Sequence, residues 1–466
     1  MALLLNHFNF RRDRGTVLLT NDAGEFLFLD EPDFATLVRD PSALRPEVRA
    51  ELEARLFLSG AHREVFASTT AARVAEQKGY LQSGPSLHIF VLTRRCNQRC
   101  VYCQVRAGLG TGAQPDMAPE TAERAVEVAL QSPAPALSFE FQGGEPTLNF
   151  ATLRHLVEYA EARRGPRPIR YAVVTNLAAV DDAMLGYFAE RGIGISTSLD
   201  GPAALHMRNR PFLDGGSFAA LERNIARARA AGCQSLGAIQ TTTRASLGQA
   251  RAIVDTYVRL GFTSIFLRPL TPLGSAQAHW ARIGYTTEEY LAFYREALAY
   301  VLELARRGVA IQERHALLLL RKIFRRPGNY MELRSPCGAA IGQLAYNYDG
   351  GIYPCDEGRM LAEMGKPAFR LGDVGTSSLR EILGSPATRA LCVASCLELL
   401  PGCGQCVYQP YCGACPVVSY AQTGSLFSRK PGDYRCTIYR GMLDTLFGYL
   451  RSDDARDRAI LKGWAA

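Results

Sequence analysis

The chain has 466 residues, of which 47% are hydrophobic and 21% are charged, and its formal net charge is +8. This composition is typical of a globular protein with about three domains, and it excludes a disordered chain. No apolar run is long enough to span a membrane, and the N-terminus lacks the pattern of a signal peptide, so we expect a cytoplasmic protein with no membrane partner. The basic residues are mostly dispersed arginines, so no nucleic-acid partner is expected.

Residues 1–83 are expected to form a small α+β domain. Two strand patterns surround a turn signal, and three helix patterns follow. The expected strands are Thr16–Thr20 and Glu25–Leu29, and the expected helices are Pro32–Arg39, Pro46–Phe57 and Ala71–Lys78. This segment contains no cysteine and no obvious catalytic cluster.

Residues 84–310 alternate strand and helix patterns. The expected strands are Leu87–Thr93, Leu137–Gln142, Ile169–Thr175, Gly194–Leu199, Leu236–Thr241 and Ser264–Pro269. The expected helices between them are Pro119–Gln131, Phe150–Arg163, Asp181–Arg191, Ser217–Ala231 and Ser246–Leu260. Six such units predict an α/β fold with a parallel sheet, and because a closed barrel needs eight, we expect a partial (β/α)6 TIM-like barrel. A long helix at Thr286–Arg307 leads to residues 311–466, where we expect a C-terminal helix but otherwise almost no regular secondary structure from Pro336 onward.

Thirteen cysteines are the unusual feature, and the first group follows the first strand of the expected sheet. Cys96, Cys100 and Cys103 have the spacing C-x3-C-x2-C and stand at the carboxyl edge, where parallel α/β folds place their active sites. Three thiolates on one loop suit a [4Fe–4S] cluster that leaves one iron open. The alternative is a zinc site with a histidine as its fourth ligand, and His88 is the nearest one in sequence.

The first motif resembles the signature of the radical S-adenosylmethionine (SAM) enzymes. Polar residues at the ends of the following strands are also similar to that family, and the resemblance implies that they bind SAM. They are Gln142, Gly143, Gly144, Glu145, Thr175, Asn176, Ser196, Ser198, Asp200, Arg210 and Arg268. The resemblance places the segment around Glu145 at the methionine amino group, and Ser198 and Asp200 at the ribose and carboxylate. Taken singly, each motif is also typical of a turn or a helix cap.

A second group of cysteines lies in residues 311–466. Two C-x2-C pairs are strong signals of a metal site, for which a double zinc ribbon is one interpretation. The group comprises Cys337, Cys355, Cys403, Cys406, Cys412, Cys415 and Cys436. Its spacing resembles the SPASM domain, the auxiliary iron–sulfur extension of many radical SAM enzymes that modify peptides, although the last pair here is one residue closer.

The SPASM resemblance implies two auxiliary [4Fe–4S] clusters. Cys403, Cys406, Cys412 and Cys436 are then the ligands of one cluster. Cys337, Cys355 and Cys415 are ligands of the other, which lacks a fourth cysteine in the motif. This cluster then either has an open iron, which could bind substrate directly, or takes an unusual ligand; Cys392 and Cys396 are candidates for that ligand, or free thiols. Asp356 stands where sulfatase-maturing relatives have a general base, and is otherwise a turn residue.

The combined resemblance implies a cytoplasmic oxidoreductase that cleaves SAM to a 5′-deoxyadenosyl radical, with electrons from a donor such as flavodoxin or ferredoxin. The segments Val17–Gly24, Phe266–Gly274, Gly404–Pro416 and Arg435–Asp444 are similar to the His-Xaa-Ser system (HxsB-like) and cyclophane-forming maturases. The expected reaction is therefore a carbon cross-link in a ribosomally made precursor peptide. Residues 1–83 are expected to recognise that precursor by adding a strand, or to cover the barrel as a scaffold.

Three alternatives remain open at this stage. A sulfatase-type maturase that forms formylglycine shares every cluster motif and Asp356. A zinc-binding interaction module without enzymatic activity would contain zinc but no iron. A radical enzyme that modifies nucleic acid would bind its substrate with a steep salt dependence.

Overall fold

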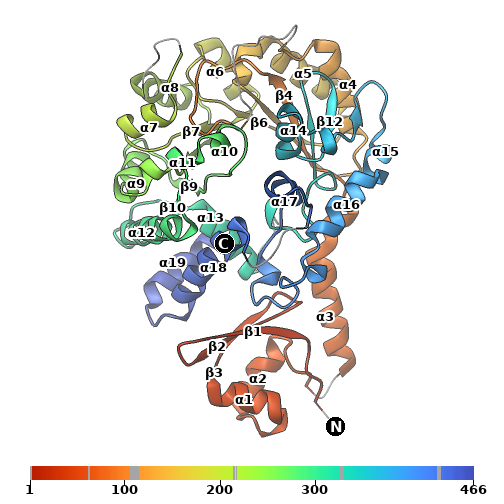
Figure 1. Ribbon diagram of the computed structural model, residues 1–466, viewed down its shortest axis with the longest axis vertical. Coiled ribbons are helices and arrows are strands. Elements are labelled where there is room, and N and C mark those ends of the chain that lie inside the picture. The colour runs from red at the N-terminus through yellow and green to blue at the C-terminus, as the bar shows by residue number, and fades with distance from the viewer. Residues whose placement is uncertain are drawn as a thin grey trace.

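The computed structural model describes residues 3–60, 63–104, 115–213, 216, 218–325, 330–427 and 432–466. Figure 1 shows three parts, with the N-terminal unit at the bottom, the α/β sheet and its helices at the top, and the C-terminal helices beside and between them. No helix among the described residues has the length and apolar character needed to cross a membrane.

The N-terminal unit is a three-stranded antiparallel sheet followed by helices. Its strands β1 (Phe8–Asp13), β2 (Thr16–Asn21) and β3 (Phe26–Asp30) pair in chain order, and the helices are α1 (Glu31–Arg39), α2 (Pro46–Ala54) and α3 (Arg63–Lys78). Val17 and Leu19 point into a core that Phe34, Leu37 and Phe57 complete. Leu18 and Thr20, on the other face of β2, are buried as well, because that face docks on the C-terminal region. The sequence missed β1, a short strand that is mostly polar.

The central sheet has ten strands and contains all six predicted parallel strands. These are β4 (Leu87–Thr93), β5 (Leu137–Gly143), β6 (Ile169–Val174), β7 (Gly194–Ser198), β8 (Leu236–Thr241) and β9 (Ser264–Arg268). The helices of this part are α4 (Pro119–Leu130), α5 (Phe150–Arg163), α6 (Asp182–Glu190), α7 (Ala203–Asn209), α8 (Phe218–Ala230) and α9 (Ala250–Arg259). The first residue of the predicted helix Ser217–Ala231 lies outside the described residues. The α/β fold class with a partial barrel is confirmed.

Side chains alternate along these strands. In β5, Phe139 and Phe141 are fully buried in the main hydrophobic core, whereas Glu140 and Gln142 are only partly buried. Because successive side chains of a strand point to opposite faces, Glu140 and Gln142 lie on the concave face of the sheet. This face carries the polar residues of the site.

Four further strands extend the sheet beyond the six predicted ones, and all come from residues after 310. At one end β10 (Gln312–Glu313) pairs with β9, and at the other β11 (Gln343–Tyr346) pairs with β4, followed by β12 (Gly351–Tyr353) and β13 (Gly372–Asp373). The buried carboxylate of Glu313 accepts bonds from the N–H groups of Leu267, His315 and Ala316, which ties β9 to the start of α13 (Arg314–Ile323). The barrel sheet thus continues across the expected boundary at 310.

The expectation of almost no regular structure from Pro336 onward, apart from a C-terminal helix, is wrong. This region contains α14 (Asp356–Glu363), α15 (Leu379–Gly384), α16 (Pro386–Ser395), α17 (Pro416–Thr423), α18 (Tyr434–Arg451) and α19 (Ala455–Ala465). Several begin at capping side chains or at a proline in the first turn, and both features favour a helix start. α18 and α19 pack on α12 (Thr287–Arg306), which follows two short helices, α10 (Ser275–Ala278) and α11 (Trp280–Ile283).

Candidate functional site

The loop after β4 carries Cys96, Cys100 and Cys103 at the carboxyl edge of the sheet, as predicted. Main-chain bonds hold this loop against residues 209–213: the N–H of Arg99 donates to Pro211 O (2.9 Å) and that of Val101 to Asn209 O (2.8 Å). Burial raises the pKa of Cys96 to about 11 and that of Cys100 to about 12. Without a metal these thiols are therefore protonated at neutral pH, and iron binding would have to displace their protons.

A buried network underneath the loop involves two predicted SAM-binding residues. Tyr102 donates from its hydroxyl to both carboxylate oxygens of Asp200 (2.7 and 2.9 Å), Asn209 donates to the same carboxylate (3.0 Å), and Arg210 donates to the Tyr102 hydroxyl (2.8 Å). Asp200 is fully buried. The Asp200 carboxylate thus helps to hold the cysteine loop, and its contact with the SAM ribose or carboxylate stays a prediction. The sequence missed Tyr102, although it stands inside the motif.

The carboxylate of Glu145 also accepts hydrogen bonds from neighbouring residues of the chain. Its carboxylate is 1% exposed and accepts bonds from the hydroxyls of Thr147 (2.7 Å) and Thr175 (2.6 Å) and from the N–H of Asn176 (2.7 Å). Glu145 thus joins the ends of β5 and β6, and the role of its segment at the methionine amino group stays a prediction. The main chain of residues 142–144 is the partly exposed portion of this segment.

Gly143 and Gly144 allow this segment to pass directly beside the start of the cysteine loop. A Cβ atom on Gly143 would lie 2.3 Å from Thr93 O, and one on Gly144 would lie 2.2 Å from Arg95 O, closer than real Cβ contacts allow. The N–H groups of Gly144 and Glu145 donate to these same oxygens, each at 2.8 Å. The two glycines are therefore required where the second strand end meets the first.

The remaining predicted SAM-binding residues lie along the same edge. Ser196 and Ser198 alternate with buried neighbours on β7 and are half-buried, like Gln142 on β5 and Arg268 at the end of β9. Asn176 donates to Asn97 Oδ1 (2.8 Å), and its side-chain nitrogen lies 4.0 Å from Cys96 Sγ. The structure thus brings the ends of four predicted strands together around the cysteine loop.

The residues around this loop fit an anionic iron–sulfur group and its nucleoside ligand. The guanidinium of Arg210 is close enough to Cys100 to oppose the rise in the pKa of that thiol, and it would offset the charge of bound thiolates. In the described part of the chain, Arg210 Nε is also a buried donor with no hydrogen-bond partner. Polar side chains on the half-exposed edge supply donors and acceptors for a nucleoside.

The zinc alternative with His88 as fourth ligand is wrong. His88 is fully buried near the start of β4, about 16 Å along the strand from the cysteine loop. Both of its ring nitrogens already have partners, the Tyr346 hydroxyl at 2.9 Å and Pro85 O at 3.2 Å. Burial lowers the pKa of His88 to about 3, so the ring is neutral.

The structure gathers Cys337, Cys355 and Cys415, the three residues assigned to the incomplete auxiliary cluster. Cys337 and Cys355 belong to one hydrophobic cluster against which Cys415 packs. Burial raises the pKa of each thiol, and the neighbouring thiols raise it further in Cys355 and Cys415. Cys355 and Cys415 are the N-cap residues of α14 and α17, and helix N-termini favour bound anions such as thiolates.

The other predicted cluster ligands lie where the C-terminal region meets the N-terminal unit. Cys403 and Cys412 pack on one small hydrophobic cluster, and Asn9 of β1 donates to Cys406 O (3.2 Å). Cys436 lies in the first turn of α18, and its N–H donates to Asp433 (3.0 Å). Among the described residues, no three His, Cys, Asp or Glu side chains are placed to hold a single metal ion. Both ligand sets therefore remain predictions.

Charged residues line the space between the barrel and the C-terminal helices. Glu332 pairs with Arg268 (3.2 Å) and with Arg435 (2.9 Å). Burial disfavours its charge, but the two guanidinium groups lower the pKa of Glu332 to about 2. Asp356 begins α14, and its Oδ1 accepts two bonds from the buried Arg359, at 2.7 and 2.9 Å. Asp356 also raises the pKa of Glu140, which places it near the concave face.

Comparison with family models identifies two domains. Residues 90–245 match the radical SAM superfamily, and residues 337–416 match the SPASM iron–sulfur cluster-binding domain. A 113-residue stretch is 30% identical to an uncharacterized protein of Methanocaldococcus jannaschii, covering 24% of this chain and only 38% of that protein. A cysteine-type anaerobic sulfatase-maturating enzyme of Clostridium perfringens is 23% identical over 306 residues, covering 64% of this chain and 79% of that enzyme.

Solved structures show the same fold. The sulfatase-maturating enzyme anSMEcpe, solved with bound S-adenosylmethionine, superposes with a TM-score of 0.68 at 19% identity over 81% of this chain and 99% of its own. SuiB of Streptococcus suis, bound to the precursor peptide SuiA, superposes with a TM-score of 0.55 at 16% identity over 92% of this chain and 99% of its own. The two domains imply [4Fe–4S] clusters and SAM as the cofactors.

Proposed function

Because the chain is an enzyme that carries a radical SAM domain followed by a SPASM domain, we propose that it matures a ribosomally made precursor peptide by forming a carbon cross-link of the cyclophane type. The supporting observation is the N-terminal unit, which docks on the SPASM region. Thr20 donates to Val407 O (2.7 Å), and Tyr411 donates to Gly24 O (3.2 Å). Superposition on the sulfatase-maturating enzyme leaves about a fifth of this chain unmatched, whereas superposition on SuiB leaves less than a tenth. Within this class, the motifs favour the His-Xaa-Ser system (HxsB-like) branch.

Two groups of residues have separate roles in this proposal, one on the sheet and one on α14. The bound cofactors supply a radical that removes a hydrogen atom from a side-chain carbon of the substrate. Gln142, Ser196 and Ser198 orient SAM from the sheet. Asp356 begins α14, and since both bonds from Arg359 reach Oδ1, its Oδ2 is available to accept a substrate proton.

Replacement of Asp356 tests this role. In the Asp356→Asn variant, modification of the precursor is expected to fall by about 100-fold or more, because general bases contribute effects of this size. Formation of 5′-deoxyadenosine is expected to continue without product, since Asp356 is not part of the cysteine loop. Chromatography measures the amounts of 5′-deoxyadenosine and of modified precursor, and their ratio is compared with that of the unchanged enzyme. Unchanged peptide modification would remove Asp356 from the mechanism. The Asp373→Asn variant is the matched control, because Asp373 also pairs with an arginine three residues away, Arg370, but lies in the edge strand β13 with a partly exposed side chain.

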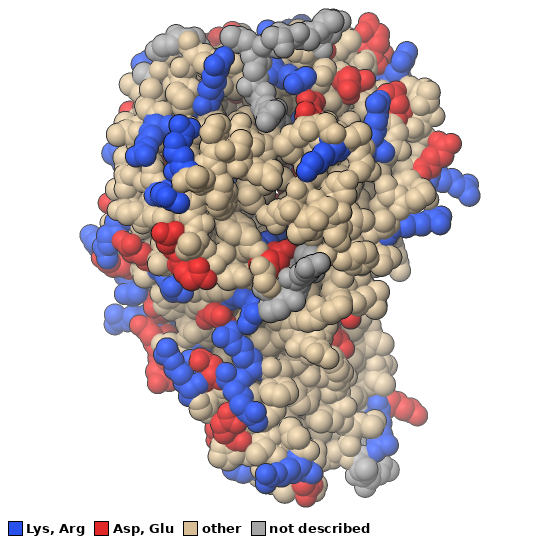
Figure 2. Space-filling view, viewed as in Figure 1, with Lys and Arg blue, Asp and Glu red and all other residues tan. Residues whose placement is uncertain are grey.

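A cleft beside the N-terminal unit offers room for the precursor. It has a volume of about 1220 Å³ between the β2–β3 turn, α3 and the loop before Cys403, and its lining includes Lys78, Tyr80 and Leu399. Both apolar and cationic side chains are therefore within reach of a peptide. Figure 2 shows basic and acidic side chains interspersed around a largely uncharged centre on the visible face, without a dense basic patch.

We further propose that the enzyme works in the cytoplasm with flavodoxin or ferredoxin as electron donor.

Co-expression tests the proposed function. The enzyme is produced with each short open reading frame encoded beside its gene, and the peptides are weighed. One peptide is expected to lose two hydrogens per cross-link, and its fragmentation should be interrupted between the two linked residues. An aldehyde that reacts with a hydrazide would favour the sulfatase-type alternative, which the similarity to the maturating enzyme of Clostridium perfringens keeps as the second candidate. No mass change with any peptide would contradict both.

A further inference from the structure

We propose that Cys392 is the fourth ligand of the auxiliary cluster whose other ligands are Cys337, Cys355 and Cys415. The proposal rests on the auxiliary cluster of the proposed enzyme and is independent of its peptide substrate. The spacing of the motif does not include Cys392, which stands more than thirty residues after Cys355 and before the first C-x2-C pair. The tertiary structure makes Cys392 a candidate, because it places α16 beside Cys337.

Ser395 ties the last turn of α16 to the main chain of Cys337. The N–H of Cys337 donates to Ser395 Oγ (3.0 Å), and the same hydroxyl donates to Leu391 O (2.7 Å), with Cys392 O at 3.3 Å. Ser395 is fully buried. A second bond, from the N–H of Leu397 to Ser335 Oγ (2.8 Å), holds the two segments together on the other side of Cys337. The end of α16 is thus fixed relative to Cys337.

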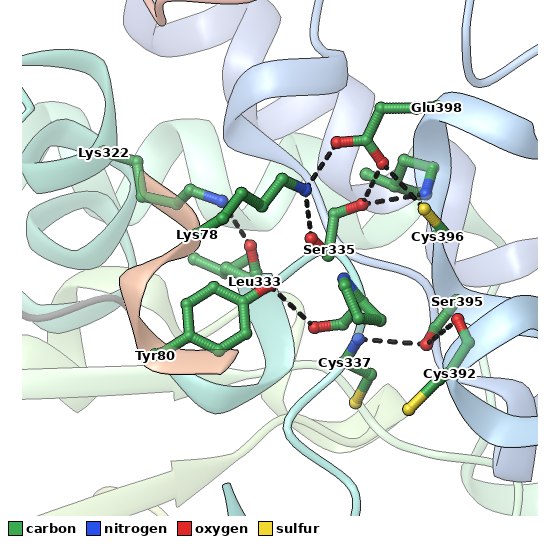
Figure 3. Close-up of polar contacts among 12 residues, drawn as sticks. Lys78, Tyr80, Lys322, Leu333, Ser335, Cys337, Cys392, Ser395, Cys396 and Glu398 are labelled. Carbon is green, nitrogen blue, oxygen red and sulfur yellow. Dashed lines mark hydrogen bonds and ion pairs between the residues drawn. The ribbon is translucent and has the colours of Figure 1, made fainter. Parts of the chain in front are cut away.

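Helix geometry then orients Cys392. Residues three apart lie on the same face of a helix, so Cys392 shares the face on which Ser395 meets Cys337. Figure 3 shows the thiol groups of Cys337 and Cys392 extending to the same side below the Ser395 bridge. Leu391 belongs to the same hydrophobic cluster as Cys337 and Cys355. Cys392 is therefore positioned beside Cys337, one of the three thiols already assigned to this cluster.

Cys396, the other candidate, points elsewhere. Its thiol donates to the Glu398 carboxylate (3.2 Å), and Figure 3 shows it on the opposite side of Ser335 from Cys337. Cys396 also lines the cleft beside the N-terminal unit, whereas Cys392 does not. Between two cysteines four residues apart, the structure therefore selects Cys392. A cluster with four thiolate ligands transfers electrons without an open iron, so substrate would not bind it directly.

The test uses the full-length chain with Cys96, Cys100 and Cys103 replaced by alanine, so that only the auxiliary clusters remain. Cys392→Ala, Cys392→Ser and Cys396→Ser are each added to this parent, and all proteins are reconstituted with iron and sulfide. Iron and sulfide content and the electron paramagnetic resonance spectrum of the reduced clusters are measured with and without imidazole. Thermal unfolding reports whether each variant is folded.

We expect the parent and Cys396→Ser to give the same spectrum, unaffected by imidazole. Cys392→Ala should either lose the iron of one cluster or show one cluster signal that imidazole shifts. Cys392→Ser should keep the iron with a shifted signal, since a serine oxygen replaces the sulfur. A parent cluster that already responds to imidazole, or a Cys392→Ala spectrum identical to that of the parent, would overturn the proposal. A parent that binds zinc and no iron would overturn it together with the auxiliary clusters. None of these readouts depends on the precursor peptide.

Discussion

Replacing Cys96, Cys100 and Cys103 together by alanine is expected to abolish the formation of 5′-deoxyadenosine from SAM. These cysteines are the only three in the chain between residues 90 and 230, and they lie on one loop at the carboxyl edge of the sheet. Without thiolates the loop has no ligand for iron, and a cluster that normally takes four thiolates cannot form there. Anaerobic assays of the reconstituted variant, with dithionite as reductant, measure the nucleoside by chromatography.

The Cys233→Ala variant is the matched control for this prediction. Cys233 is also buried, but its thiol contacts only the carbonyl oxygen of Leu185 at 3.6 Å among the bonds of the described residues. Its replacement is expected to keep nucleoside formation within about twofold of the parent, since Cys233 lies outside the cysteine loop and alanine removes only its thiol and one weak bond. Residual nucleoside formation in the triple variant at the level of the Cys233→Ala control would mean that the first cluster is bound elsewhere.

The Asp200→Ala variant is expected to have a free energy of unfolding about 3 kcal/mol lower than the parent, since it leaves the buried Arg210 without its anionic partner. Tyr102→Phe should cost about 1–2 kcal/mol, because one buried hydroxyl and its bonds are lost. In the variant that carries both changes, the loss of stability should be smaller than the sum of the two single losses, since both residues belong to one network. Urea unfolding of the apoprotein measures the free energies, and iron content after reconstitution measures the effect on the cysteine loop.

Asp182→Asn is the control for the network. The Asp182 carboxylate also pairs with an arginine, Arg227 at 2.7 Å, but its side chain is 89% exposed. Exposed ion pairs contribute little, so we expect a change within about 0.5 kcal/mol. If Asp200→Ala destabilised the protein no more than Asp182→Asn, then Tyr102 and Arg210 would have found other partners, and the loop would not depend on Asp200.

Much of the central sheet was predictable because each strand is a local pattern. β4 and β8 begin and end at the predicted residues, and the other four differ by one residue at one end. Such strands are recognisable because each is a short apolar or alternating run bounded by turn signals. β10 and β13 were missed because each is two residues long, and only their pairing with β9 and β12 makes them strands.

The roles of the acidic site residues were harder to predict from the sequence. Glu145 and Asp200 stand in motifs that place them at the edge of the sheet, and both are there. Whether a carboxylate at that edge faces a ligand or its own neighbours depends on which donors the folded chain brings to it. For Asp200 these donors come from Tyr102 and Asn209, and for Glu145 from Thr175 and Asn176, so the distinction is a property of packing.

The spacing of the cysteines was sufficient to predict three thiols on one loop and two C-x2-C pairs, because neighbouring residues on a short loop cannot lie far apart. It could not decide which distant thiols share a cluster. Cys337, Cys355 and Cys415 are brought together only because α14, α16 and α17 pack around one hydrophobic cluster, and Ser395 of α16 bonds to the main chain of Cys337. Local sequence patterns therefore determined the chemistry of this protein, whereas long-range hydrogen bonds and hydrophobic packing decided which side chains act together.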